Sequence, residues 1–261
     1  MMKIAVAGGT GVVGAYVVET AREVGHETVT LSRSRGVDLR NLEGLDDALA
    51  NVNVIIDVAN SSSLSGGRAT SFFELLASNL QAAGSRSGVA HYVLLSIVGI
   101  DRVPHYGYYA AKRAQESATT SGDIPVSIVR ATQFHEFGAQ IMARSKVGPF
   151  VLVPSLPVKS IAARSVSEVL VETAMGLPLD SILEIAGPDV VNLADECREL
   201  AKLRGRSERV IAIRPPGRSG RAMRSGALIP NESVRMTGPG FIDWLHSPDG
   251  QRAIGFVRSS G

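Results

Sequence analysis

Gly8-Gly9-Thr10-Gly11-Val12-Val13-Gly14 is the stretch that decides the fold. It follows a short apolar run, Ile4–Ala7, which is typical of a strand buried on both faces. From Val12 to Val24 apolar residues recur on one face of a helix, and Gly25 closes it. Glycine at this spacing lets the backbone turn sharply and lets a pyrophosphate rest on the free N–H groups at the helix start. A glycine-rich turn that only connects a strand to a helix is the alternative.

Strands and helices alternate through the first half of the chain. Further strands are predicted at 27–31, 52–59, 92–95 and 126–130, with helices around 42–49, 72–83 and 108–119 between them. Alternation at this spacing predicts an α/β fold with a Rossmann-type, doubly wound parallel sheet.

The regular alternation of predicted strands and helices ends at about residue 132. Ser165-Val166-Ser167-Glu168 has the pattern of a capping box that opens a helix running to Met175. A strand at 182–186 and a helix at 193–203 follow. We expect residues 1–150 to form the NAD(P)-binding Rossmann domain. Residues 151–261 are expected to form a smaller, C-terminal substrate-binding lobe, with one or two elements returning to the main sheet.

The residues after the second predicted strand indicate which dinucleotide is bound. An acidic residue at this point would bind the ribose 2′-hydroxyl and favour NAD. The chain instead reads Leu31-Ser32-Arg33-Ser34-Arg35, with no acid before Asp38. One cation between two hydroxyls suits a 2′-phosphate, so NADP(H) is the preferred cofactor and NAD(H) a possible one. The alternative is that these arginines only point into solvent.

Ser96, Tyr108 and Lys112 are the candidate catalytic residues. Ser96 is predicted to end the strand at 92–95, and Tyr108 and Lys112 lie four residues apart on one face of a helix. A tyrosine in this place acts as a general acid toward a carbonyl, and a nearby ammonium lowers its pKa from about 10. The serine hydroxyl would hold the substrate oxygen. Because Tyr109 is adjacent to Tyr108, the sequence does not decide which of the two tyrosines is the general acid.

Three stretches together resemble a known family. They are Ala7-Gly8-Gly9-Thr10-Gly11-Val12-Val13-Gly14, Tyr92-Val93-Leu94-Leu95-Ser96-Ile97-Val98-Gly99 and Tyr108-Tyr109-Ala110-Ala111-Lys112. The chain resembles, over roughly residues 3–135, the atypical or extended short-chain dehydrogenases/reductases of the NmrA-like NAD(P)-binding group. That resemblance implies a catalytic Ser96, Tyr108 and Lys112, with the lysine also bound to the nicotinamide ribose. Many members have proline where this chain has Ala131, so the loop over the nicotinamide is expected to differ.

The expected contacts follow from the motif and the resemblance together. Gln133, Phe134 and His135 are candidates to line a substrate pocket, although His135 is equally suited to a structural role. The cofactor contacts are expected from Gly8, Thr10, Gly11, Val12, Val13, Gly14, Ser32, Arg33, Ser34, Asp38, Leu39, Val58, Ala59, Asn60, Ser96, Tyr108, Lys112, Ala131 and Thr132. Asp57, just before Val58, is also expected near the ribose and phosphate.

Two classes of function remain open. The first is an NADP(H)-dependent oxidoreductase that transfers hydride between nicotinamide and a carbonyl or alcohol, or an epimerase or dehydratase with the same residues. The second is a non-catalytic NADP(H)-binding redox sensor, because NmrA-like proteins include regulators. Such sensors tend to lack the tyrosine and lysine that this chain retains. A further alternative is a vestigial site in a chain whose small lobe only mediates subunit contacts.

Composition and net charge limit the kinds of partner and the location that we expect for this protein. A formal charge of +2 over 261 residues does not suggest nucleic acid or an anionic membrane, and no apolar run approaches the roughly 18 residues of a membrane helix. The single cysteine, Cys197, permits no disulfide within the chain, and the histidines show no metal-ligand spacing. We expect a cytoplasmic protein without a signal peptide or metal, monomeric or homodimeric, that acts on a small molecule.

Arginines crowd the C-terminal quarter. A solvated basic face is the simpler interpretation, and a site for an anionic substrate or partner is the alternative. The residues are Arg204, Arg206, Arg209, Arg214, Arg218, Arg221 and Arg224.

Overall fold

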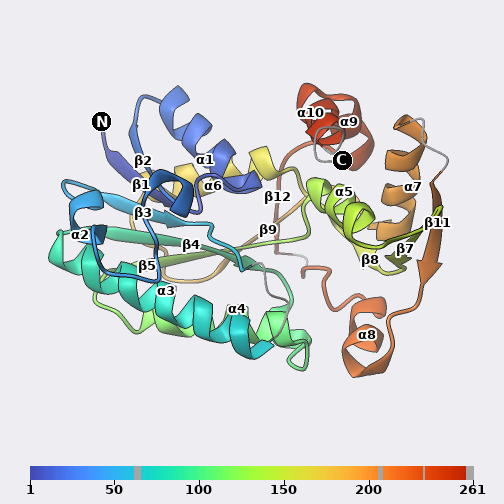
Figure 1. Ribbon diagram of the computed structural model, residues 1–261, viewed down its shortest axis with the longest axis horizontal. Helices are drawn as coiled ribbons and strands as arrows, with labels where there is room; N and C mark the ends of the chain where they lie inside the picture. The colour runs from blue at the N-terminus through green and yellow to red at the C-terminus, as the bar shows by residue number, and fades with distance from the viewer. Residues whose placement is uncertain (62–65, 205–207, 232, 257–261) are drawn as a thin grey trace. The chain divides into compact units, whose positions relative to one another are not determined.

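The computed structural model describes residues 1–61, 66–204, 208–231 and 233–256. The chain divides into two compact units (Figure 1). The first contains Met1–Arg130 and Arg164–Glu184, and the second contains Ala131–Ala163 and Ile185–Gly261. These units divide the chain at positions other than residue 150, and the functional division expected there stays a prediction.

Seven strands form one sheet in the order β12-β9-β5-β4-β3-β1-β2 (Figure 1). The pairings of β1 with β2 and β3, of β3 with β4, and of β9 with β12 are parallel. The chain moves from β1 to β2 on one side and then returns to β3 on the other, so the predicted doubly wound parallel sheet is confirmed. The strands are β1 Lys3–Ala7, β2 Glu27–Leu31, β3 Val54–Asp57, β4 His91–Ile97, β5 Val126–Ala131, β9 Leu183–Ala186 and β12 Arg235–Met236.

Helices cover both faces of this sheet in the first unit (Figure 1). Helices α3 and α4 pack together on one face, where Gly66 and Gly107 bring their backbones close. On the other face α1 and α6 are joined by a hydrogen bond of 3.0 Å between the hydroxyls of Thr20 and Ser167. The first unit's helices are α1 Val12–Glu23, α2 Leu45–Ala48, α3 Gly66–Arg86, α4 Gly107–Thr120 and α6 Ala163–Met175, with 3₁₀ turns η1 Arg33–Arg35 and η2 Ile100–Arg102.

The core of the first unit explains why its strands read as continuous apolar runs. Ile4, Val6, Ile55 and Ile56 are fully buried, although neighbours in a strand point to opposite faces. Both faces are covered by helices, so neither needs polar residues. Burying an aliphatic side chain of this size stabilises the fold by roughly 1.5–3 kcal/mol.

The second unit contains two further small sheets. Strand β7 (Phe150–Pro154) pairs with β6 (Lys146–Val147) and β11 (Arg209–Ile213), and β8 (Pro157–Val158) pairs with β10 (Val191–Asn192). Helix α7, predicted at 193–203, spans Leu193–Leu203, and its N-cap Asn192 accepts a hydrogen bond from the Ala194 N–H. The other helices are α5 His135–Arg144, α8 Gly217–Arg224, α9 Phe241–His246 and α10 Pro248–Phe256.

The predicted capping box at Ser165 is wrong. Helix α6 begins two residues earlier, at Ala163, so Ser165 is a buried residue within its first turn. The Ala163 N–H is instead bound by the Glu136 carboxylate, 3.2 Å away. Its partner comes from 27 residues away in the sequence, which a local pattern does not reveal.

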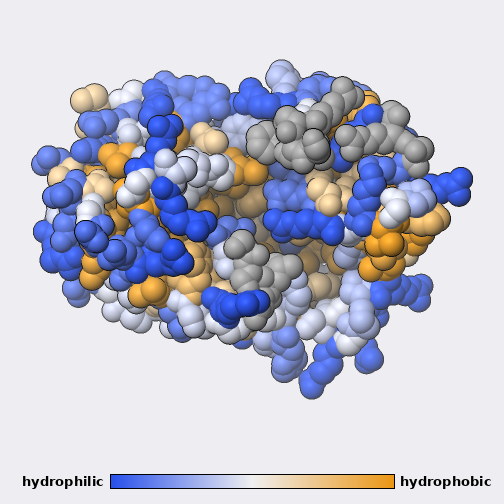
Figure 2. Space-filling model, viewed as in Figure 1, coloured by the Kyte–Doolittle hydropathy of each residue, from blue (hydrophilic) through white to orange (hydrophobic). Residues whose placement is uncertain are grey.

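The C-terminal arginines do not share one environment. Arg204 is buried, whereas Arg209, Arg214, Arg218 and Arg221 are exposed and Arg224 is half-buried. Figure 2 shows hydrophilic side chains projecting at the lower edge of the view, where α8 lies in Figure 1. Arg206 lies outside the described residues. No helix in the described part of the chain is long and apolar enough to cross a membrane.

Candidate functional site

The glycine turn connects β1 to α1 at the carboxyl end of the parallel sheet, where ligands bind in folds of this kind. Gly8 has φ +81°, and a Cβ there would lie 2.7 Å from the Ala59 Cα. A Cβ on Gly14 would lie 2.2 Å from the Gly8 carbonyl oxygen. The turn therefore has close backbone packing that only glycine permits at these two positions.

The start of α1 has the properties of an anion site. Its N-cap, Gly11, offers no side chain to the first amides, and the first turn contains no acidic residue. Thr10 and Val12 are exposed, whereas Val13 and Gly14 are buried. The amides of the first turn and the positive end of the helix dipole are thus available to a phosphate, as a dinucleotide requires.

The segment after β2 forms the short turn η1. Arg33 is exposed there, between Ser32 and Ser34, whose hydroxyls lie 3.0 Å apart. Asp38 is paired with Arg40, whose hydrogen bonds lower the pKa of the Asp38 carboxyl to about 2. Leu39 is buried in the core, and its carbonyl accepts a hydrogen bond of 3.0 Å from Asn79.

The segment after β3 separates into an inner and an outer part. Asp57 was expected beside the ribose and phosphate, but it is fully buried and bonded to protein groups. Val58 is half-buried, Ala59 is buried against the glycine turn, and Asn60 is exposed. The Asn60 side-chain oxygen accepts a hydrogen bond of 2.7 Å from the Tyr108 hydroxyl.

Ser96 lies within β4, which continues to Ile97 rather than ending before it. The side chain is 2% exposed, and its hydroxyl has no hydrogen-bond partner among the residues that the structure describes. An unpaired buried hydroxyl is costly unless something binds it, so it fits a group that contacts a ligand.

Tyr108 and Lys112 share a neighbouring side chain. Both contact Phe73 of α3: the Tyr108 ring lies 6.2 Å from its ring, and the Lys112 ammonium lies 5.0 Å above it. Tyr109 is buried on another side of α4 and packs edge-on against Tyr106 at 4.9 Å. The structure thus distinguishes the two neighbouring rings, which the sequence alone leaves ambiguous.

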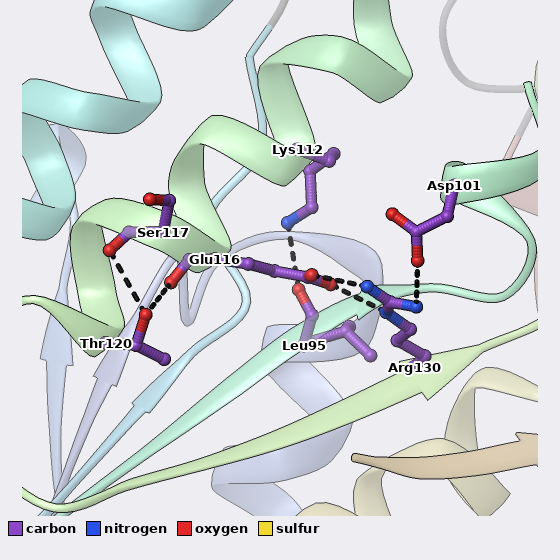
Figure 3. A network of polar contacts seen from close by, with 7 residues as sticks. All are labelled: Leu95, Asp101, Lys112, Glu116, Ser117, Thr120 and Arg130. Atoms are coloured by element: carbon purple, nitrogen blue, oxygen red, sulfur yellow. Dashed lines mark hydrogen bonds and ion pairs between the residues drawn. The ribbon is translucent and has the colours of Figure 1, made fainter. Parts of the chain in front are cut away.

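Lys112 is buried, and its ammonium is bound by other groups than the Tyr108 phenol. It donates to the Leu95 carbonyl oxygen at 2.9 Å (Figure 3) and to the Gln115 side-chain oxygen. Burial lowers the pKa of Lys112 to about 8, while Asp57 and Glu116 oppose that change. Burial, followed by Tyr106, raises the pKa of Tyr108 to about 12. The expected lowering of the tyrosine pKa by the lysine is therefore wrong for this arrangement.

A buried ion pair fixes α4 against the sheet, and the sequence pattern did not indicate it. Arg130 of β5 donates to both oxygens of Glu116, at 2.9 and 2.6 Å, and to Asp101 at 2.6 Å (Figure 3). The Arg130 and Glu116 side chains are each 10% exposed. Because Glu116 follows Lys112 by one helical turn, this pair holds the helix that carries the candidate catalytic residues.

The remaining predicted residues belong to the second unit. Ala131 and Thr132 are buried, and the Thr132 hydroxyl donates to the Lys159 carbonyl at 2.6 Å. Gln133 and Phe134 are half-buried.

His135 is fully buried in the second unit. One of its ring nitrogens lies 2.9 Å from the Ser160 hydroxyl, and the other lies 3.2 Å from the Pro239 carbonyl oxygen. Burial lowers the pKa of His135 to about 4. Two engaged nitrogens favour the structural role for this histidine.

Comparisons with known proteins show the fold. No protein-family model matches the sequence, and no curated protein matches it either. Among solved structures, the chain is similar to an NAD-dependent NDP-hexosamine 5,6-dehydratase of tunicamycin biosynthesis (16% identity, TM-score 0.73, 100% of this chain and 99% of that one).

Two further structures have related folds. A UDP-N-acetylglucosamine 4-epimerase from Bacillus cereus is 17% identical, with a TM-score of 0.71 over 100% of this chain and 98% of its own. The triphenylmethane reductase of Citrobacter sp., complexed with NADP(H), is 15% identical, with a TM-score of 0.67 over 90% of this chain and 96% of its own. The chain thus has the Rossmann-type fold found in these epimerases, dehydratases and reductases.

Proposed function

We propose that this chain is an NADP(H)-dependent oxidoreductase that acts on a small carbonyl compound or alcohol. The observation that carries the proposal is the presence of three features in one unit. They are the tight glycine turn, the unpaired buried hydroxyl of Ser96, and the Tyr108–Lys112 pair on one face of α4. A fold of this type hosts many functions, so the function is argued from these residues.

Tyr108 is proposed to move the proton. Its phenol is protonated throughout the physiological range because its pKa lies near 12, and its hydroxyl already donates a hydrogen bond to Asn60. A protonated donor suits the reductive direction, in which the substrate oxygen gains a proton as its carbon gains hydride. Bound NADPH supplies that hydride.

Ser96 and Lys112 are proposed to orient the reactants. The Ser96 hydroxyl, free of protein partners within the described residues, donates to the substrate oxygen. The Lys112 ammonium binds the nicotinamide ribose, as the family resemblance implies. The other predicted cofactor and substrate contacts, and the NmrA-like group itself, stay predictions.

A transient use of the cofactor is the second candidate. Two of the similar structures are an epimerase and a dehydratase named for nucleotide-sugar substrates. The same serine, tyrosine and lysine support oxidation followed by re-reduction of a sugar. In that case a bound nucleotide sugar, rather than a free carbonyl compound, is the substrate.

The oxidation of NADPH, followed by absorbance, tests the proposal against a panel of aldehydes, ketones, enones and quinones. We expect turnover of at least one class. Nucleotide sugars are tested separately for epimerisation or loss of water with NAD present. Tight NADPH binding with no reaction of either kind would favour the alternative function, a non-catalytic NADP(H)-binding redox sensor.

Replacing Arg33 tests the cofactor preference. We expect Arg33→Ala to weaken NADPH binding by roughly 10- to 150-fold, since a hydrogen bond to a charged group contributes about 1.5–3 kcal/mol. NADH binding is expected to be unchanged. Both affinities are measured by fluorescence titration, with Arg35→Ala as the control from the same exposed turn. Wild-type protein that binds NADH as tightly as NADPH would contradict the role given to Arg33.

A further inference from the structure

Asp57, at the end of β3, is a buried carboxylate that accepts three hydrogen bonds. One oxygen accepts from the Ala59 N–H at 2.9 Å. The other accepts from the Tyr92 hydroxyl at 2.9 Å and from the Gln115 side-chain amide at 2.8 Å. These three hydrogen bonds lower the pKa of the carboxyl and favour its ionised form, against burial, which raises that pKa.

Gln115 connects this carboxylate to Lys112. Its NH₂ group donates to Asp57, and its oxygen accepts from the Lys112 ammonium. Asp57 and Gln115 are fully buried, and Lys112 is 5% exposed. The orientation of the amide is dictated from both ends, because reversing it would place two donors against each other at Lys112.

The carboxylate is itself held in place. The Ala59 amide that binds it belongs to the residue whose Cα packs against Gly8 of the glycine turn. Tyr92 holds it from β4, the strand that also contains Leu95, the second acceptor of the Lys112 ammonium. The Asp57 carboxylate, the Gln115 amide and the Lys112 ammonium thus form one hydrogen-bond network inside the first unit.

We propose that Asp57 is a positioning residue for the catalytic pair: acting through Gln115, it holds the Lys112 ammonium protonated and in place beside the cofactor. The inference rests on the proposed function for its catalytic meaning, but the contacts stand independently of it. The sequence predicted a place for Asp57 beside the ribose and phosphate, whereas its side chain is fully buried and bonded to protein groups.

Among the described residues, several groups influence the charge of Lys112 and Asp57. Glu116 of α4 also favours the charged form of Lys112, and Tyr92 of β4 has its pKa raised by burial and then by Asp57, so it remains neutral. From α3 the Phe73 ring faces the ammonium. Burial raises the pKa of Asp57, and Lys112 is the first group that opposes this. The negative charges of Asp57 and Glu116 therefore both favour the protonated form of Lys112.

Nuclear magnetic resonance of the lysine ε-methylene groups tests the inference without requiring turnover. The sequence has five lysines, and Lys112→Met assigns the signal: Lys3, Lys112, Lys146, Lys159 and Lys202. We expect Asp57→Asn to lower the Lys112 pKa from about 8 by roughly one to three pH units, because an opposite charge is lost from beside the ammonium. Asp123→Asn, at an exposed position, is the control and leaves that pKa unchanged.

A double variant provides a rescue. In Asp57→Asn/Gln115→Glu the carboxylate moves from position 57 to position 115, next to the Lys112 ammonium. The new amide at 57 donates to the new carboxylate at 115, which accepts from Lys112. We expect the Lys112 pKa to return to at least its wild-type value. If Asp57→Asn does not fold, Gln115→Met breaks the same link with Asp57 intact and is expected to lower the Lys112 pKa.

The outcomes separate the two proposals. An unchanged Lys112 pKa in folded Asp57→Asn or Gln115→Met would overturn the positioning role, whatever the protein catalyses. A lowered pKa with rescue, but no turnover by the wild type, would support the positioning role while the proposed oxidoreductase fails. Where turnover exists, activity that depends on the ammonium falls as pH rises through the Lys112 pKa. We expect that fall at lower pH in Asp57→Asn.

Discussion

Tyr108→Phe is expected to reduce turnover with NADPH by roughly 10²- to 10⁴-fold, the usual contribution of a positioned general acid. The change removes one hydroxyl and leaves the ring packed against Phe73 at 6.2 Å. The lost hydrogen bond to Asn60 is at the exposed side of the site, so the fold should persist. Steady-state kinetics give kcat and kcat/KM, and fluorescence titration shows whether NADPH binding survives.

Tyr109→Phe is the matched control for this prediction. It removes a hydroxyl from the adjacent residue of the same helix, whose ring packs on Tyr106 instead. We expect near wild-type turnover. A comparable loss in both variants would mean that α4 is sensitive to any change, and equal activity of Tyr108→Phe and wild type would exclude the phenol as the acid.

Glu116→Gln is expected to destabilise the protein by about 3–5 kcal/mol, because it leaves the Arg130 guanidinium buried without its main anion. The two hydrogen bonds that Arg130 donates to Glu116 are the chief reason that the pKa of Arg130 is raised above its ordinary range. At the usual 2–4 °C per kcal/mol for a domain of this size, Tm should fall by roughly 6–20 °C. Thermal unfolding followed by circular dichroism measures it.

Asp101→Asn provides the comparison at the other end of the same guanidinium. The Asp101 side chain is 57% exposed, so its ion pair with Arg130 is expected to contribute less than about 1 kcal/mol. The difference between the two variants isolates the effect of burial. Equal losses would show that exposure does not govern this network.

Elements with strong local signals were predictable from the sequence. The strand at 27–31 and the helix at 193–203 have the predicted bounds. The glycine turn was also recognisable, because one of its constraints is local: a Cβ on Gly14 would lie 2.2 Å from the Gly8 carbonyl oxygen. The period of apolar residues is a local property, and a single sequence displays it.

The partners of buried polar groups were not predictable in the same way. Asp57 bonds to Gln115 across 58 positions, and Glu136 binds the Ala163 amide across 27. Nothing in the spacing of these residues indicates which will meet, since the sheet and helices bring them together only after folding. The inward orientation of Asp57 and the true start of α6 were missed for this reason.

The division into two units has a consequence for how the chain can be altered. The backbone passes from one unit to the other three times, at 130–131, 163–164 and 184–185. The chain leaves the first unit within β5, returns to it for nearly all of α6, and leaves it again within β9. A chain that ends at any point after β5 and before α6 therefore lacks α6 and β9, a helix and a strand that pack with the first unit's sheet.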